Sequence, residues 1–183
     1  MLKSAHWFVM TPARREFLTL SAVAAGAALL GGLVGALALQ SGTGAADLLA
    51  SRYPDLSGRI RALSEWQGRR LVCNFWAPWC EPCRDELPLL DAAWRQYAPR
   101  RLEFVGIAID TAPNVREYLK VVNIGYPVLV GEAGALGLMR SLGNKAAALP
   151  FTVLLDAAGR VRQTKLGAFT GPELDSGIAA LLR

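Results

Sequence analysis

Residues 72–88 read VCNFWAPWCEPCRDELP and contain two cysteines, Cys80 and Cys83, that are separated by two residues. Before them lies an apolar run, 71–76, that is rich in strand-forming residues. After them, apolar residues recur at three-to-four spacing over 81–98. The first pattern predicts a buried strand and the second predicts a helix. The two cysteines are therefore expected where a core strand leads into the first turn of a helix.

This placement favours redox chemistry at the cysteine pair. A cysteine at a helix N-terminus lies near unpaired backbone N–H groups, which stabilise its thiolate. We expect Cys80 to be the exposed nucleophile that attacks a disulfide, and the more buried Cys83 to resolve the mixed disulfide. Pro82 suits an early helical position because its missing N–H is not needed there. Pro88, inside the helix, should kink it.

Other uses of the cysteine pair fit the sequence less well. Tetrahedral zinc needs four ligands, whereas the chain has three cysteines and one histidine, His6. The position of that histidine also excludes a Ser-His-Asp triad and a Cys-His nucleophile pair from the body of the chain. A purely structural disulfide would close a very small loop and would stabilise the fold little. We expect neither a metal ion nor a cofactor.

Length and composition indicate one globular domain with an appendage. The chain has 183 residues, of which 52% are hydrophobic and 19% are charged, so it can bury a core. The formal net charge is +5, but no block of lysines and arginines stands out in the body of the chain. We therefore expect no nucleic-acid partner.

Residues 1–39 are expected to be an export signal or a membrane anchor. The run 17–39 carries no charge and is long enough to cross a hydrocarbon core of about 30 Å. The positive residues on its N-terminal side keep that end cytoplasmic and direct the rest outward. Residues 14–18, Arg-Arg-Glu-Phe-Leu, resemble a twin-arginine export signal. Residues 36–38, Ala-Leu-Ala, offer a cleavage site, so a cleaved signal and a retained anchor both remain open.

The remaining residues predict a flexible tether, 40–46, and a folded domain, 47–183. Within the domain, strands and helices alternate before a β-hairpin and a last helix, a pattern typical of an α/β protein with a mixed sheet flanked by helices. Besides the first strand and helix, the patterns predict strands over 102–109, 126–130, 151–155 and 161–166, and helices over 115–122, 133–142 and 170–182.

The motif over residues 72–88, with Trp79 before the first cysteine and Pro88 in the helix, resembles the thioredoxin superfamily. More narrowly, it is similar to the extracytoplasmic thiol–disulfide oxidoreductases of the TlpA/ResA type. The resemblance runs from about Leu56 to the C-terminus and implies a thioredoxin fold. It also implies a strand–helix insert, which residues 123–148 can supply. Finally, it implies a cis-proline at Pro150 that faces the cysteines and presents backbone to a substrate.

The same resemblance assigns a role to Glu86. Thioredoxins carry a buried aspartate that assists proton transfer where this chain has Asn74, and an asparagine cannot do so. The TlpA/ResA group uses a glutamate shortly after the second cysteine, and Glu86 matches that position. Glu86 follows Cys83 by three residues, so both lie on one helix face, and burial would raise its pKa. A solvated surface glutamate remains the alternative.

Two further sets of residues follow. The resemblance implies that residues flanking the cysteines and the proline contact substrate, namely Trp79, Glu81, Pro82, Leu149 and Pro150. The third thiol, Cys73, is expected to be a buried core residue, with a regulatory pairing as the alternative.

The predicted function is the reduction of protein disulfides outside the cytoplasm, at the inner membrane or in the bacterial periplasm. The negative charge of Glu81 disfavours the thiolate, which makes the pair a better reductant. A reductant in that compartment needs electrons from a membrane partner of the CcdA/DsbD type. The resemblance suggests apocytochrome c or copper-delivery proteins as substrates.

Three other functions remain open: a thiol peroxidase of the peroxiredoxin type, a metallochaperone and a non-catalytic binding module. Peroxidatic cysteines sit in a Pro-x-x-x-Thr-x-x-Cys setting, which residues 74–79 do not provide. The intact pair of cysteines argues against a protein that only binds.

Overall fold

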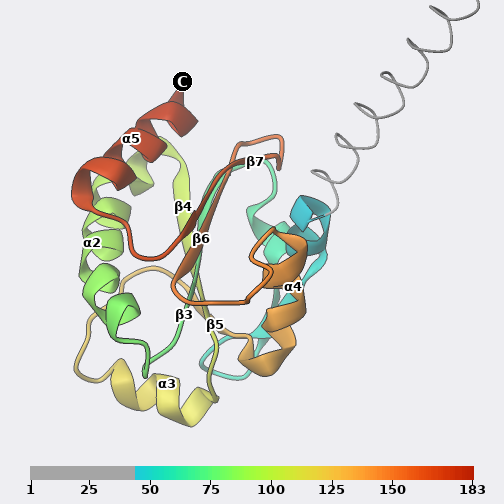
Figure 1. Cartoon of the computed structure of the whole chain (residues 1–183), viewed down its shortest axis with the longest axis vertical. Helices are drawn as coiled ribbons and strands as arrows, with labels where there is room; N and C mark the ends of the chain where they lie inside the picture. The colour runs from blue at the N-terminus through green and yellow to red at the C-terminus, as the bar shows by residue number, and fades with distance from the viewer. Residues whose placement is uncertain (1–43) are drawn as a thin grey trace, which may run out of the picture. The chain divides into compact units, whose positions relative to one another are not determined.

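A five-stranded mixed sheet forms the centre of the computed structural model, which describes residues 44–183. The strand order is β5-β4-β3-β6-β7 (Figure 1). β4 runs parallel to β3 and β5, whereas β6 runs antiparallel to β3 and β7. The predicted α/β thioredoxin fold with a mixed sheet is confirmed. The strands are β3 (Arg70–Trp76), β4 (Leu102–Ala108), β5 (Val128–Val130), β6 (Phe151–Leu155) and β7 (Val161–Leu166).

Helices cover both faces of this sheet. On one face lie α2 (Glu81–Tyr97) and α5 (Gly171–Leu182), side by side in Figure 1, whose apolar residues pack on Val72 and Trp76 of β3. On the other face lie α4 (Ala135–Ser141) and a helix over 44–50, against Leu71, Cys73 and Phe75. Successive residues of β3 thus point to opposite faces, and both faces are buried. The remaining helices are α3 (Ala112–Tyr118), η1 (Leu63–Trp66), η2 (Ala98–Arg100) and η3 (Glu132–Gly134).

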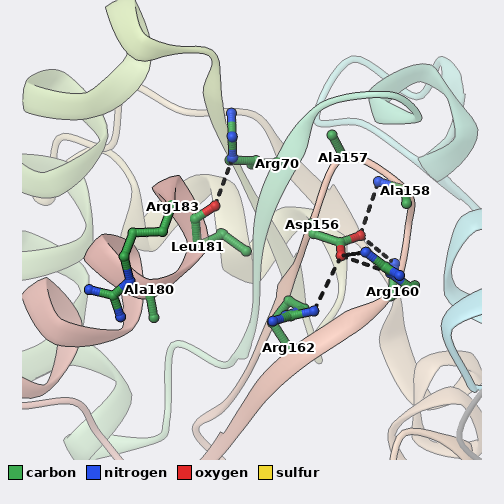
Figure 2. Close-up of a pocket in the computed structure, with 9 residues that line it drawn as sticks. All are labelled: Arg70, Asp156, Ala157, Ala158, Arg160, Arg162, Ala180, Leu181 and Arg183. Atoms are coloured by element: carbon green, nitrogen blue, oxygen red, sulfur yellow. Dashed lines mark hydrogen bonds and ion pairs between the residues drawn. The ribbon is translucent and has the colours of Figure 1, made fainter.

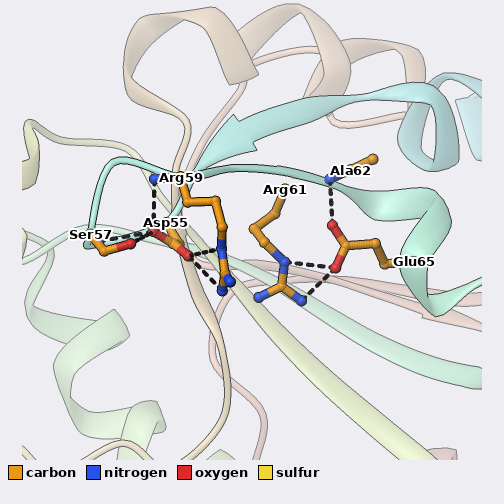
Figure 3. A network of polar contacts seen from close by, with 6 residues as sticks. All are labelled: Asp55, Ser57, Arg59, Arg61, Ala62 and Glu65. Atoms are coloured by element: carbon orange, nitrogen blue, oxygen red, sulfur yellow. Dashed lines mark hydrogen bonds and ion pairs between the residues drawn. The ribbon is translucent and has the colours of Figure 1, made fainter.

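A small hairpin of β1 (Arg52–Pro54) and β2 (Ile60–Ala62) precedes the sheet. Its turn is organised by Asp55, whose carboxylate accepts hydrogen bonds from the Ser57 hydroxyl and from the backbone N–H groups of Ser57 and Arg59 (Figure 3). These bonds lower the pKa of Asp55 to about 2. Because Asp55 also bridges to Leu129 of β5, the hairpin is joined to the edge of the main sheet.

The predicted insert is present. Residues 123–148 contribute β5, η3 and α4, which add an edge strand and a covering helix before Pro150. The predicted strand over 126–130 is shorter than expected and begins at Val128, after Pro127. The helix expected over 115–122 instead spans Ala112–Tyr118, with a proline in its first turn. α2 continues through Pro88 as one helix.

The tether prediction is wrong at its C-terminal end. Residues 44–46 belong to the helix 44–50, because Ala45 and Leu48 are buried in the core beside α4. Gly44 is needed there, since a Cβ at this position would lie 2.5 Å from the Ser141 carbonyl oxygen.

The predicted signal or anchor and most of the tether lie outside the described residues. Within residues 44–183, no helix has the length and apolar character that crossing a membrane requires. Residues 41–183 form a compact unit with core clusters on both faces of its sheet.

Candidate active site

The two cysteines meet where β3 leads into α2. Cys80 is the N-cap of α2 and Cys83 lies in its first turn. Their sulfurs form a disulfide with an S–S distance of 2.02 Å, and their Cα atoms are 5.2 Å apart. The Cys83 backbone N–H also donates to the Cys80 sulfur, at 3.3 Å. The helix N-terminus thus supplies a donor to the sulfur that should become the nucleophile after reduction.

The cysteines are less accessible than expected. Cys83 is fully buried, as predicted, but Cys80 is only 6% exposed rather than open to solvent. The reason is that Cys80 also packs into the core cluster under α2. Accessible surface around the pair comes from Trp79, which is 67% exposed, and from Glu81 and Pro82, which are also exposed. These three predicted contact residues are thus exposed at positions close to Cys80 in the sequence.

Pro150 lies at the end of the sheet from which the chain leads to the cysteines. The peptide bond between Leu149 and Pro150 is cis. Since Phe151 pairs with Phe75 in the register of β6 and β3, Pro150 enters the sheet at the end where β3 leads to Cys80. The Pro150 carbonyl accepts from the Gly167 N–H at 2.9 Å, so it is already occupied. Leu149, before the cis bond, is half-buried.

Glu86 is a buried carboxylate one helical turn beyond Cys83. Glu86 is only 2% exposed, which rules out the alternative that it is a solvated surface glutamate. One carboxylate oxygen accepts the Phe169 backbone N–H at 2.8 Å, and the other accepts the Asn74 side-chain amide at 3.1 Å. Removal from water opposes ionisation more strongly than these bonds favour it, so the pKa of Glu86 rises to about 7. Such a group can gain and lose a proton near neutral pH.

Two residues that support Glu86, Phe169 directly and Thr152 through Asn74, carry no signal of their own in the sequence. Thr152 pairs with Asn74 in the register of β6 and β3, and its hydroxyl oxygen accepts the Asn74 amide at 2.9 Å. Phe169 reaches Glu86 through its backbone only. The one sequence signal for Thr152 is its position two residues after Pro150. Asn74 therefore links the proline strand to the carboxylate.

Cys73 does not belong to this site. It is fully buried in the core cluster on the other face of the sheet, and burial raises its pKa. Cys80 and Cys83 lie in the cluster under α2. Among residues 44–183, no group of three or more His, Cys, Asp and Glu is arranged to hold a metal ion.

Comparisons with known proteins agree with this geometry. The family model described as AhpC/TSA family matches residues 43–164. The thioredoxin-like protein YneN of Bacillus subtilis is 27% identical over 124 residues, which cover 66% of this chain and 69% of that protein. The thiol-disulfide oxidoreductase ResA of Bacillus thuringiensis is 28% identical over 122 residues, covering 66% of this chain and 68% of that protein.

Solved structures show the same fold. A putative thiol:disulfide interchange protein DsbE from Chlorobium tepidum superposes with a TM-score of 0.65 at 25% identity, covering 73% of this chain and 93% of that one. A thioredoxin-related protein from Neisseria meningitidis serogroup B superposes with a TM-score of 0.63 at 28% identity, covering 72% of this chain and 98% of that one. The chain belongs to the AhpC/TSA family, and its similarity to the thiol–disulfide oxidoreductases of the TlpA/ResA type is confirmed.

Proposed function

We propose that this thioredoxin-like thiol–disulfide oxidoreductase reduces disulfide bonds in proteins outside the cytoplasm. The observation that carries the proposal is the joint placement of three features at one end of the sheet. These are the Cys80–Cys83 pair at the start of α2, the cis bond before Pro150, and the buried carboxylate of Glu86. The relatives are named for the same chemistry.

The reaction proceeds in two exchanges. In the reduced protein, the Cys80 thiolate attacks one sulfur of a substrate disulfide, and the other substrate sulfur leaves as a thiolate. Cys83 then attacks the Cys80 sulfur of this mixed disulfide, which releases the second substrate thiolate and restores the Cys80–Cys83 disulfide. Two electrons pass from the protein to the substrate.

Glu86 serves the second exchange as the proton acceptor for Cys83. A buried thiol attacks slowly unless its proton is taken up, and a base works best when its pKa lies near the working pH. The pKa of about 7 meets this requirement. Asn74 and the Phe169 N–H hold the carboxylate in place.

The sequence and the family resemblance support a proposal for the partners and the compartment. Residues 17–39 support export and anchoring, with the twin-arginine-like residues 14–18 as the export signal. A reductant there draws electrons through the membrane from a donor of the CcdA/DsbD type. Apocytochrome c and copper-delivery proteins are the proposed substrates.

Variants of the two cysteines test the proposal. Cys83→Ser removes the resolving sulfur, so Cys80 should form mixed disulfides that persist, whereas Cys80→Ser should form none. Non-reducing gels with a disulfide-bonded protein substrate, followed by mass spectrometry of the linked peptides, measure this. Cys73→Ala is the matched control and should retain the activity of the natural chain, because Cys73 lies on the other face of the sheet.

Trapping through Cys83 in the Cys80→Ser variant would reverse the assigned roles. A thiol peroxidase would instead consume hydrogen peroxide with Cys80 alone and would leave Cys83→Ser active in a peroxide-consumption assay. The structure favours the reductase, since both sulfurs are bonded to each other within one helical turn.

A further inference from the structure

Two adjoining hollows lined by arginines lie at the end of the sheet away from the cysteines. The first, of about 270 Å³, lies beside the end of α5 and the turn between β6 and β7 (Figure 2). The second, of about 600 Å³, shares Arg70 and Ala157 with the first. We call the joint surface the arginine face; its basic residues are Arg69, Arg70, Arg101, Arg160, Arg162 and Arg183.

The arginine face carries the whole positive excess of the domain. Its six arginines are accompanied by two carboxylates, Asp156 and Glu103, which gives a formal charge of +4. The rest of residues 41–183 has 11 basic and 12 acidic residues, a formal charge of −1. A field of one sign over one surface attracts an anionic partner to that surface.

The arginines keep donors free for such a partner. Asp156 is shared, because it pairs with Arg160 at 2.9 Å and with Arg162 at 3.8 Å. Arg70 uses its Nε to donate to the Leu181 carbonyl at 2.7 Å, which fixes the guanidinium at the mouth of the hollow. A guanidinium has five N–H donors in a planar fork that matches the oxygens of a phosphate group. The hollows therefore suit phosphate oxyanions.

The strand directions separate this face from the redox site. Arg70 opens β3, and Cys80 comes after the end of that strand. The seven residues of β3, at roughly 3.3 Å each, separate the two ends. Asp156 follows β6 at the Arg70 end, whereas Pro150 precedes β6 at the other end. An anion bound by the arginines would thus leave Cys80 accessible to substrate.

The chain enters the domain beside the arginine face. A Cβ on Gly159, in the β6–β7 turn next to Arg160, would lie 2.8 Å from a methyl group of Leu49 in the helix 44–50. Only residues 40–43 separate that helix from the uncharged run 17–39. The described part of the chain therefore begins near the arginine face.

We propose that the arginine face binds the phosphate groups of anionic phospholipids and holds the domain on the membrane surface with Cys80 directed away from it. This inference goes beyond the proposed redox function. It also does not require residues 17–39, since the attraction comes from residues of the folded domain.

Vesicle binding by the oxidised fragment 41–183 tests the inference without a redox step. The fragment is a compact unit with its own core, and the Neisseria structure that matches 72% of this chain consists almost entirely of the equivalent part. We expect sedimentation with vesicles of phosphatidylcholine containing phosphatidylglycerol, no sedimentation with phosphatidylcholine alone, and loss of binding at high salt. The double variant Arg162→Gln/Arg183→Gln should bind at least about tenfold more weakly.

A matched variant distinguishes binding through the arginine face from a general effect of net charge. Arg116→Gln/Lys120→Gln removes the same charge from α3 and the turn that follows it. Because α3 lies at the cysteine end of the sheet (Figure 1), this variant should change binding less than twofold. Equal losses in both variants, or no binding to anionic vesicles, would overturn the proposal. Binding to polyglutamate but not to vesicles would instead indicate an acidic protein partner. Tight binding of inorganic phosphate that displaces the vesicles would indicate a site for free phosphate.

Discussion

The protonation of Glu86 near neutral pH depends on the fold. Burial raises its pKa from 4.5 to about 7, so the folded chain binds a proton that the unfolded chain releases in this range. The stabilisation linked to that proton is complete below pH 4.5 and is lost as the pH rises through about 7. A glutamine does not ionise, so in Glu86→Gln the stability no longer falls as the pH rises through about 7. We expect the variant to exceed the natural chain in unfolding free energy by about 1–3 kcal/mol at pH 8, and by much less at pH 4.5.

Urea unfolding of both proteins at the two pH values measures this difference. The same variant should slow the attack of Cys83 on a mixed disulfide by about a hundredfold at pH 7, because no base remains to take its proton. In the natural chain this rate should rise through about pH 7, and in Glu86→Gln that rise should vanish. An unchanged pH profile in the variant would show that another group accepts the proton.

Glu81 lies between the two cysteines in the sequence, and we expect its charge to influence their reduction potential. Its exposed carboxylate lies in the first turn of α2 and opposes a thiolate at Cys80. We expect Glu81→Gln to stabilise the reduced form and to raise the potential by about 10–20 mV. Equilibration with a dithiol buffer measures the shift, with Glu117→Gln on α3 as the control. An unchanged or lower potential would contradict the role of this charge.

For single residues, the sequence predicted the reactive side chains but not the residues that hold them in place. The spacing of Cys80, Cys83 and Glu86 along one helix is local, so periodicity and family resemblance could predict it. Thr152 reaches the site through the pairing of β6 with β3, and the Phe169 N–H reaches it from a segment far away in the sequence. No local sequence pattern encodes either contact. For the same reason, the low exposure of Cys80 could not be predicted.

Among the elements, α2 is held in position by the segment that leads to β5. The Gly125 N–H donates to the Asp91 carboxylate at 2.7 Å, and Asp91 also pairs with Arg95. Trp94 lies directly over Gly125, because a Cβ there would be 2.0 Å from its ring. The glycine thus allows the chain to approach the helix that carries both cysteines.

Gly125→Ala should therefore disturb the packing of α2. We expect the unfolding free energy to fall by about 1–3 kcal/mol, since Trp94 must move aside. Gly137→Ala, in α4, is the control: its Cβ would meet no atom within 4 Å, so the free energy should stay unchanged or rise by about 0.5–1 kcal/mol. Urea unfolding compares the two. Equal effects would show that the contact with Trp94 does not constrain the helix.

The elements that were predicted best from the sequence are those that can be recognised from their own residues alone. β3 and β4 are mostly apolar because both faces of the sheet are covered, and their bounds are close to the prediction. The predicted tether 40–46 overlaps the helix 44–50 at residues 44–46, because Gly and Ala there form no periodic pattern. Its helical state depends on burial of Ala45 and Leu48 beside α4, which is a tertiary contact.

Considered as a whole, the domain separates two activities along the direction of its strands. Cysteines, Pro150 and Glu86 gather where β3 ends, whereas the arginines gather where it begins. A domain held by the arginine end would present its redox end to soluble protein substrates. This arrangement gives a physical reason for one small domain to act on the outer surface of a membrane.

The central claim is that the cysteine pair donates electrons, and its reduction potential tests this most directly. The measurement is a titration of fragment 41–183 against a dithiol buffer, with the Cys80–Cys83 disulfide quantified by thiol labelling. We predict a potential near or below about −270 mV, which characterises thioredoxin-like reductants. A potential near about −120 mV would identify an oxidant and would contradict both the proposed direction of electron flow and the need for a membrane electron donor.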